Sequence, residues 1–269
     1  METLRRFSFP TSAAQRAVLT PFTYLLLSIV GLTAGFVDAI AGGGGLLTVP
    51  ALLWAGLPPQ VALGTNKFQS SCGTTLAAVD YTRARLLRWR ELRLGIAITA
   101  LAGMAGTQVV TRLDADFLRQ IIPILLLAIA GYFWWKPELG RERHARRMET
   151  ATFAWSFGIT LGFYDGFFGP GTGSFWMVAC VLLLGLDLGA ATGHTKAMNL
   201  ASNLGSLVVF LAAGQVRFDV GAAMIAGQLV GAKLGSGLVI RHGARFVRPV
   251  FLAVVLVLAG RLLWLAAHE

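Results

Sequence analysis

Charged side chains are scarce in this chain of 269 residues, where they make up 13% of the total. A soluble domain carries about a quarter charged residues, so the shortage excludes an ordinary soluble protein. Hydrophobic residues make up 55% of the chain, and they gather in runs long enough to cross the hydrocarbon core of a bilayer. The composition therefore predicts an all-α, polytopic membrane protein whose main partner is the lipid bilayer.

Acidic residues are rarer than basic ones, with 13 Asp and Glu against 23 Lys and Arg. The basic residues cluster between the apolar runs, which fits the cytoplasmic bias of positive charge in membrane proteins better than binding to nucleic acid. We therefore expect no nucleic-acid partner. The expected location is the cell membrane.

Cysteines number only two, and Cys72 and Cys180 both lie inside apolar runs. No CxxC or Cys/His ligand spacing is present, so we expect no disulfide, no metal site and no cofactor. A Walker A pattern is also missing, which indicates that the chain does not power itself with ATP.

The apolar runs divide the chain into ten segments, separated by charged residues or by Pro and Gly. If 44–56 and 173–189 are re-entrant, the chain crosses the membrane eight times rather than ten. The ten segments are expected at 22–41, 44–56, 62–80, 93–111, 117–135, 151–168, 173–189, 194–213, 220–240 and 246–266.

Three pairs of motifs recur in the same order, which predicts an internal duplication with five segments in each half. The offset between partners is 127 residues for the first pair and 129 for the other two. The pairs are "GFVDAIAGGG" (35–44) with "GFYDGFFGPG" (162–171), "GTNK" (64–67) with "GHTK" (193–196), and "DFLRQIIPILLLAIAGYFWW" (116–135) with "RFVRPVFLAVVLVLAGRLLW" (245–264).

The duplication divides the chain into four parts. We expect an N-terminal basic tail at 1–21, a first transmembrane repeat at 22–135, a basic linker at 136–150 and a second repeat at 151–266. The loop after 62–80 is rich in Arg, while its counterpart after 194–213 keeps only Arg217. This difference in positive charge between equivalent loops favours inverted repeats, although the arginines of the N-terminal tail argue for the opposite orientation.

The stretch "GFVDAIAGGGGLLTVPALLWAGLPPQVALGTNK" (35–67), repeated in degenerate form after the basic linker, resembles the TauE/SafE family of sulfite and organosulfur-anion exporters. The resemblance extends over about 30–264 and implies a membrane transporter. The second half departs from the pattern, with "GPGTG" in place of the four glycines and Met177 near the place of Pro50.

Glycine-rich breaks inside two apolar segments predict a binding site. A backbone freed from its helix has no water to bond in lipid, so it must be buried in protein or line a cavity. The helix that restarts after each break points N–H groups and a positive dipole end at that cavity, which suits an anion. The alternative is that the glycines only allow close helix packing. We expect the breaks to meet at Gly42, Gly43, Gly44 and Gly45 and at Gly171, Thr172 and Gly173.

Two lysines, Lys67 and Lys196, hold equivalent positions in the third segment of each half. A lysine deep in a membrane helix is costly unless it faces a hydrated cavity or a counter-charge. We expect both to bind the anion, although each could instead extend its charged end toward the membrane surface. The residues before them could donate hydrogen bonds to the same anion, and these are Thr65, Asn66, His194 and Thr195.

Two carboxylates, Asp38 and Asp165, form another matched pair inside the apolar segments. They are candidates for coupling transport to protons, and the alternative is a fixed salt bridge to Lys67 or Lys196. Asn199 and Asn203 lie one turn apart beyond Lys196, where they could line the substrate path or bond across helices.

Glycines at 227, 231 and 235, and at 158, 162 and 166, have the four-residue spacing of helix-packing faces. Lys233 lies within the first of these faces, where we also expect packing.

Together the features predict a secondary transporter that exports a small anion, such as sulfite or an organosulfonate. The chain is not expected to be an enzyme; an intramembrane enzyme and a passive anion channel are the alternatives. The sequence also allows a homo-oligomer.

Overall fold

The computed structural model describes residues 19–135 and 145–242, and within them all regular structure is helical. The helices are α1 (Pro21–Ala41), α2 (Gly45–Trp54), α3 (Pro59–Arg83), α4 (Trp89–Val110), α5 (Ala115–Trp135), α6 (Thr150–Phe167), α7 (Thr172–Leu184), α8 (Leu188–Ala212) and α9 (Phe218–His242). These confirm nine of the ten expected segments, with small shifts at their ends. The tenth segment, 246–266, lies outside the described residues, as do most of the tail 1–21 and most of the linker 136–150.

Local sequence explains where several helices begin. Thr20 precedes α1 and its hydroxyl accepts a hydrogen bond from the N–H of Thr23, and Pro21 stands in the first turn. Asp187 precedes α8 and accepts from the N–H groups of Gly189 and Ala190. Such caps satisfy the N–H groups that the first helical turn leaves without a partner.

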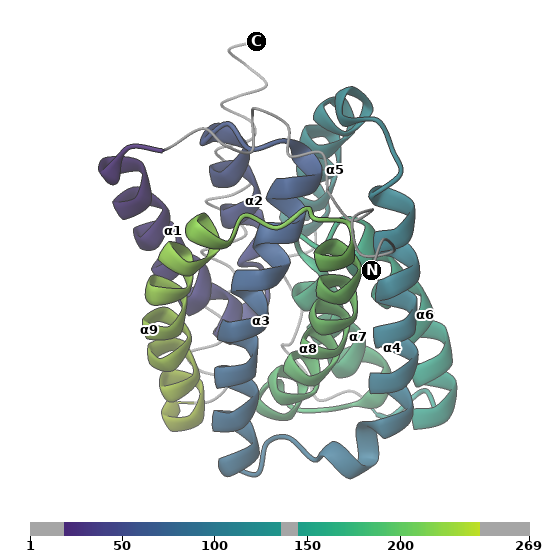
Figure 1. Ribbon diagram of the computed structural model, residues 1–269. Helices are drawn as coiled ribbons and strands as arrows, with labels where there is room; N and C mark the ends of the chain where they lie inside the picture. The colour runs from purple at the N-terminus through teal and green to yellow at the C-terminus, as the bar shows by residue number, and fades with distance from the viewer. Residues whose placement is uncertain (1–18, 136–144, 243–269) are drawn as a thin grey trace, which may run out of the picture.

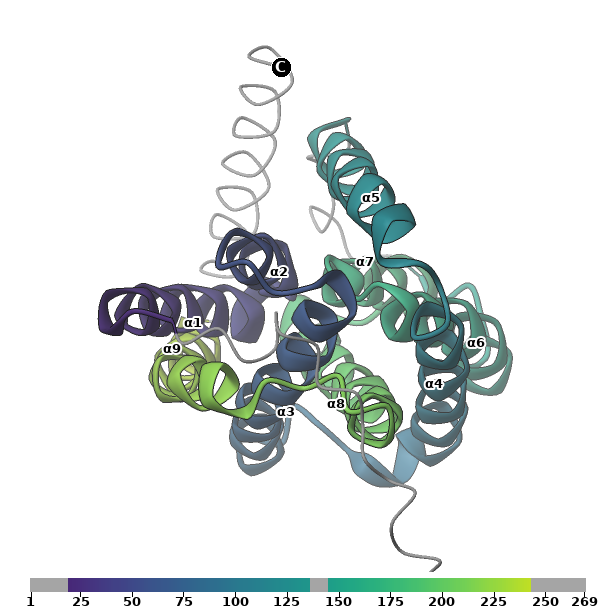
Figure 2. The same cartoon turned by 45° about the horizontal axis from the view of Figure 1, so that its top comes forward.

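Three described helices, α1, α4 and α9, are long and apolar enough to cross a membrane. α3 and α8 are longer than α1 and α4 but carry many buried polar residues. Figure 2 shows why: α3 and α8 lie in the middle, with the α1–α9 pair on one side and the α4–α6 pair on the other. Polar side chains on a central helix can be satisfied by other helices, whereas those facing lipid cannot.

Glycines allow the outer helices to pack closely. A Cβ atom added at Gly231 would lie 1.9 Å from the carbonyl oxygen of Leu32 in α1, and one at Gly166 would lie 1.9 Å from that of Gly103 in α4. This confirms the packing role expected for both glycine faces.

The main contacts join elements of different halves: α1 packs on α9, α6 on α4, α3 on α9 and α8 on α4. In Figure 1, α3 runs down to the loop that leads to α4, whereas α8 runs up to the loop that leads to α9. Helices at equivalent positions therefore point in opposite directions. This arrangement is the one that inverted repeats require, and the duplication itself stays a prediction that the contacts support.

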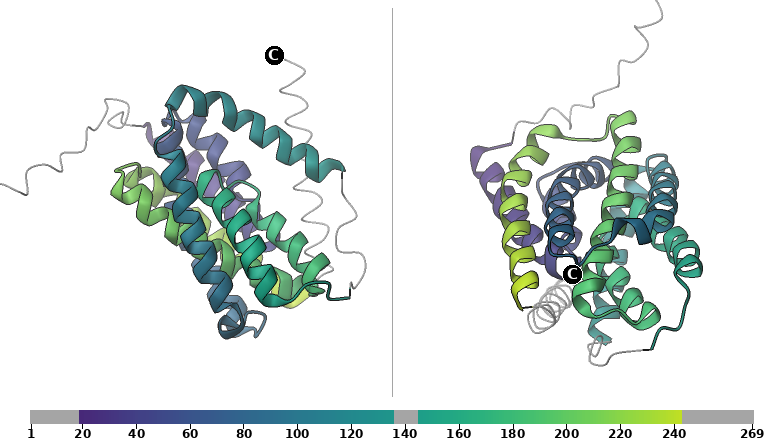
Figure 3. Two further views of the ribbon diagram at one scale, coloured as in Figure 1. Left: turned by 90° about the vertical axis from the view of Figure 1, so that its right-hand side faces the viewer. Right: turned by 90° about the horizontal axis from the view of Figure 1, so that it is seen from below.

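Two short helices and α5 complete the molecule. α2 and α7 each follow a break, and α2 turns back toward the end of the molecule from which α1 starts (Figure 1). α5 lies obliquely across one end of the other helices, where Leu118 and Ile122 are buried (Figure 3).

Candidate functional site

The two helix breaks meet in the centre of the molecule. α1 ends at Ala41, and Gly42 follows with a left-handed φ of 67°. In the second half, Gly169 and Gly171 have φ values of 94° and 83°. A Cβ atom on Gly42 would lie 2.5 Å from the backbone of Gly173, so the breaks touch each other and confirm the expected meeting. The glycines thus break the helices and also allow close packing, and their part in binding an anion stays a prediction.

Side chains from three helices bind the carbonyl groups at the broken end of α1. The Lys196 ammonium of α8 donates to the carbonyl of Asp38, and the Tyr81 hydroxyl of α3 donates to that of Ala39 at 2.7 Å. Ser174 of α7 donates to the carbonyls of Ala41 and Gly42. The last turn of a helix leaves carbonyls without partners, and here other helices supply the donors.

Two buried ion pairs connect the halves crosswise. Lys67 of α3 lies 2.8 Å from an Asp165 carboxylate oxygen in α6, and their side chains are 2% and 6% exposed. Lys196 of α8 lies 3.0 Å from an Asp38 carboxylate oxygen in α1, with side chains 0% and 16% exposed. Each lysine lies eight residues after the first residue of its helix. Both are buried in ion pairs, so neither charge extends to the membrane surface, and whether a carboxylate also takes up a proton stays a prediction.

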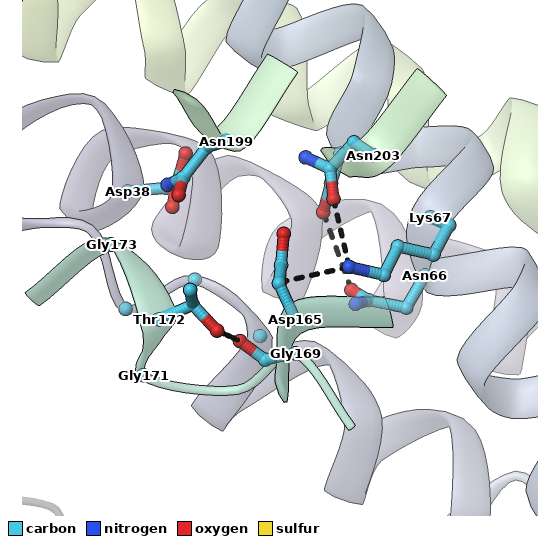
Figure 4. A pocket seen from close by; sticks show the side chains of 14 residues that line it. Asp38, Asn66, Lys67, Asp165, Gly169, Gly171, Thr172, Gly173, Asn199 and Asn203 are labelled. Carbon is cyan, nitrogen blue, oxygen red and sulfur yellow. Dashed lines mark hydrogen bonds and ion pairs between the residues drawn. The ribbon is translucent and has the colours of Figure 1, made fainter. Parts of the chain in front are cut away.

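The Lys67–Asp165 pair has further partners. Lys67 also donates to Asn203 Oδ1 at 3.1 Å, and Ser202 donates to the second carboxylate oxygen of Asp165. Figure 4 shows Lys67 between the Asp165 and Asn203 side chains. Charged groups this deeply buried need such additional hydrogen bonds, because the ion pair alone does not compensate for lost hydration.

A cavity with a free volume of about 30 Å³ lies between the breaks and these ion pairs. This is room for roughly two water molecules. The cavity is lined by Asp38, Gly43, Gly44, Gly45, Asn66, Lys67, Ser70, Asp165, Gly169, Gly171, Thr172, Gly173, Asn199 and Asn203 (Figure 4).

Backbone N–H groups face this cavity without partners. Within the described residues, the N–H groups of five lining glycines make no hydrogen bond, and these are Gly43, Gly44, Gly45, Gly171 and Gly173. Four of the five residues are buried and Gly45 is half-buried. Buried N–H groups almost always have a partner in native proteins, so this cluster is suited to bind a hydrogen-bond acceptor.

Comparison with known proteins decides the family. The family model described as "Sulfite exporter TauE/SafE" matches residues 27–262. The chain belongs to the TauE/SafE family. A "Probable membrane transporter protein YfcA" of Escherichia coli (strain K12) is 43% identical over 247 residues, which cover 92% of each chain.

Other relatives carry similar names. A "Probable membrane transporter protein" of Haemophilus influenzae is 41% identical over 239 residues, covering 89% of this chain and 94% of its own. A "Sulfite exporter TauE/SafE family protein 6" of Arabidopsis thaliana is 28% identical over 112 residues, covering 41% of this chain and 26% of its own. No solved structure matches the chain. The chain is therefore a membrane transporter of the TauE/SafE family.

Most of the expected site residues of this TauE/SafE chain line the cavity. The twelve are Asp38, Gly43, Gly44, Gly45, Asn66, Lys67, Asp165, Gly171, Thr172, Gly173, Asn199 and Asn203. These twelve residues come together because the breaks of both halves, one face of α3 and one face of α8 all border the cavity.

Five expected residues do not line the cavity: Gly42, Thr65, His194, Thr195 and Lys196. The Thr65 hydroxyl accepts a hydrogen bond from the N–H of Arg217 at 2.9 Å. His194 lies beside an apolar cavity with Trp176 and Met198. Neighbouring residues on a helix point about 100° apart, so proximity to a lysine in sequence does not place a side chain beside it in space.

Sequence reasoning missed Ser70. Gly169 belongs to the second break that the sequence predicts, but it is not among the residues expected to bind the anion. Ser70 follows Asn66 by one turn of α3 and therefore shares its face. The repeat offset of 129 residues also pairs Ser70 with Asn199, so the repeat alignment contained a signal for it. Asn66 is held in place by the buried Thr48 of α2, whose hydroxyl donates to Asn66 Oδ1.

The charges around the cavity cancel. Two ammonium groups face two carboxylates, so the side chains of the site contribute no net charge. The N-terminal ends of α2 and α7 add about half a positive charge each. The site is thus weakly positive through its backbone, and its one lining ammonium is that of Lys67.

Proposed function

We propose that this transporter is a secondary carrier that exports a small anion, such as sulfite or an organosulfonate, across a bacterial inner membrane. The observation that carries the proposal is that five glycines with unpaired backbone N–H groups and the Lys67 ammonium line one cavity. Preorganised N–H groups at helix N-termini, with a cation beside them, form an anion site.

The shape of the site favours a compact oxyanion. The donors come from two breaks that both line the cavity, so several oxygens of one anion can be bound at once. The free volume of about 30 Å³ accommodates only a small group, and a longer organosulfonate needs the site to open. The direction of transport and the sulfur chemistry of the substrate rest on the description of the TauE/SafE family.

A flux assay tests the proposal. The full chain is reconstituted in liposomes and supplied separately with sulfite, sulfate, sulfoacetate, isethionate and the zwitterion taurine. We expect saturable flux of at least one of the anions, with taurine the poorest substrate because it has no net negative charge. A passive channel would not concentrate the anion against its gradient, so counterflow into liposomes preloaded with unlabelled anion separates carrier from channel. Absence of flux for all of the anions would exclude the proposal.

A further inference from the structure

We propose that Asp38 binds a proton whenever the cavity binds an anion, so that the two move through the protein in the same direction. This inference rests on the proposed function and goes beyond it by assigning the coupled ion and its residue. The sequence alone left Asp38 and Asp165 as equal candidates, and the structure separates them.

The two carboxylates differ in how completely they are bonded. Asp165 has a partner on each oxygen, Lys67 on one and Ser202 on the other. Asp38 bonds to Lys196 through Oδ2 alone, and its Oδ1 makes no hydrogen bond within the described residues. The Asp38 side chain is also more exposed, 16% against 6%, and both line the cavity. The open Oδ1 of Asp38 is therefore the place where a proton can bind.

Lys196 keeps a partner when Asp38 becomes neutral. Its ammonium donates to the backbone carbonyl of Asp38 as well as to the carboxylate, and it does not line the cavity. Protonation of Asp38 thus leaves Lys196 in place but uncompensated. The site then has one net positive charge, which a monoanion cancels. With Asp38 ionised, the side chains have no net charge, and only the partial positive charge of the helix N-termini would offset the same anion, so binding is less favourable.

A neighbouring amide supports the protonated form. Asn199 lines the same cavity, and its buried Oδ1 has no hydrogen-bond partner within the described residues. Figure 4 places Asn199 and Asp38 on one side of the cavity and the Lys67–Asp165 pair on the other. A protonated Asp38 can donate to this amide oxygen or to the anion, whereas an ionised Asp38 can donate to neither.

The carboxyl, ammonium and phenol groups on the helices around Asp38 have hydrogen-bond or ion-pair partners of their own. α3 contributes Tyr81, whose hydroxyl is bound to the Ala39 carbonyl, and Asp80, which is paired with Lys233 of α9 at 2.7 Å. α6 contributes Asp165 and Tyr164, whose hydroxyl donates to the Pro170 carbonyl at 2.8 Å, and α8 contributes Lys196 and His194. α2 has no titratable side chain, and the one of α7 is the buried Cys180.

The charge balance has a measurable consequence. The proton leaves water and forms an O–H bond at Asp38, so a monoanion and its proton cross together without net charge. A membrane potential then does not drive monoanion flux. A dianion with one proton keeps one negative charge, and an inside-negative potential drives it outward. Sulfate and isethionate separate these cases, because neither titrates near neutral pH.

The experiment measures proton movement with a pH dye inside liposomes while sulfate or isethionate enters. In the parent we expect about one proton per anion in the same direction, and a KM that rises with pH by up to about tenfold per unit, because the anion binds together with a proton. Asp38→Asn should move the anion without a proton, with a KM independent of pH and with isethionate flux that now responds to voltage. Asp80→Asn, a buried carboxylate outside the cavity, is the matched control and should keep the coupling.

Two results would overturn this inference and leave the proposed function standing. They are anion flux in the parent without proton movement, and unchanged proton movement in Asp38→Asn. If Asp38→Asn does not fold, Asp38→Glu should keep the proton and shift the pH at which KM changes, and an unshifted profile counts against Asp38. Absence of flux for every anion of the screen would remove the proposed function and this inference with it.

Discussion

At the scale of single residues, the two buried lysines have different surroundings although they hold equivalent positions. Lys67 lines the cavity and is shared between Asp165 and Asn203. Lys196 lies behind Asp38 and binds the broken end of α1. A charge inside a membrane protein is tolerated when it is paired, and here each pair also joins one half of the chain to the other.

The role of Lys67 in binding the anion can be separated from its role in folding. Lys67→Met should raise KM for the anion about tenfold or more, because a charge-assisted hydrogen bond contributes about 1.5–3 kcal/mol. It should also lower the melting temperature, since a buried unpaired carboxylate costs about 3–5 kcal/mol. Flux and thermal unfolding of the purified protein measure the two effects.

The control for this variant is the double substitution Lys67→Met with Asp165→Asn. It removes both charges, so it should recover much of the melting temperature without recovering KM. Parent-like flux in the double variant would show that Lys67 has only a structural part.

At the scale of elements, the break after α1 depends on Gly42, which alanine cannot replace without strain. Gly42→Ala would place a Cβ atom 2.5 Å from the backbone of Gly173 and would force a left-handed φ on alanine. The φ penalty alone is roughly 1–2 kcal/mol, and the contact adds to it. We expect a clear fall in melting temperature. Gly43→Ala, whose nearest neighbours would be 3.8 Å away, should fold like the parent.

The contact between α1 and α9 depends on a second set of glycines. Gly231→Ala would bring a Cβ atom within 1.9 Å of the Leu32 carbonyl oxygen, so the helices must separate and the protein should lose stability. Gly237 lies in the same helix with nothing within 4 Å, so Gly237→Ala should gain up to about 1 kcal/mol from helix propensity. Thermal unfolding of both variants tests this, and equal destabilisation would contradict it.

At the scale of the whole molecule, the loops that follow α3 and α8 lie at opposite ends (Figure 1). If the halves are inverted repeats, these loops face opposite sides of the membrane, and the Arg-rich loop after α3 faces the cytoplasm. Arg88→Cys and Ala213→Cys place one exposed thiol in each loop, in a background with Cys72 and Cys180 replaced by Ala. Membrane-impermeant reagents should label Ala213→Cys from outside intact cells and Arg88→Cys only after permeabilisation. Labelling of both from one side would contradict the inverted arrangement.

Much of this transporter could be predicted from its sequence, because the relevant information is local. Hydropathy located nine of the nine described helices, and Gly and Pro located the breaks at 42–44 and 169–171. The same motifs identified the matched lysines and aspartates, since repeated residues in apolar runs need no knowledge of packing to be seen.

The sequence by itself thus determined the membrane class, the helices, the breaks and the residue types of the site. Only the tertiary structure decided which lysine meets which aspartate, and that Lys67 lines the cavity whereas Lys196 does not. Lys196 and Asp38 are 158 residues apart along the chain. Helical periodicity specifies the face of a side chain on its own helix, whereas its partner depends on how helices from the two halves cross and rotate against one another.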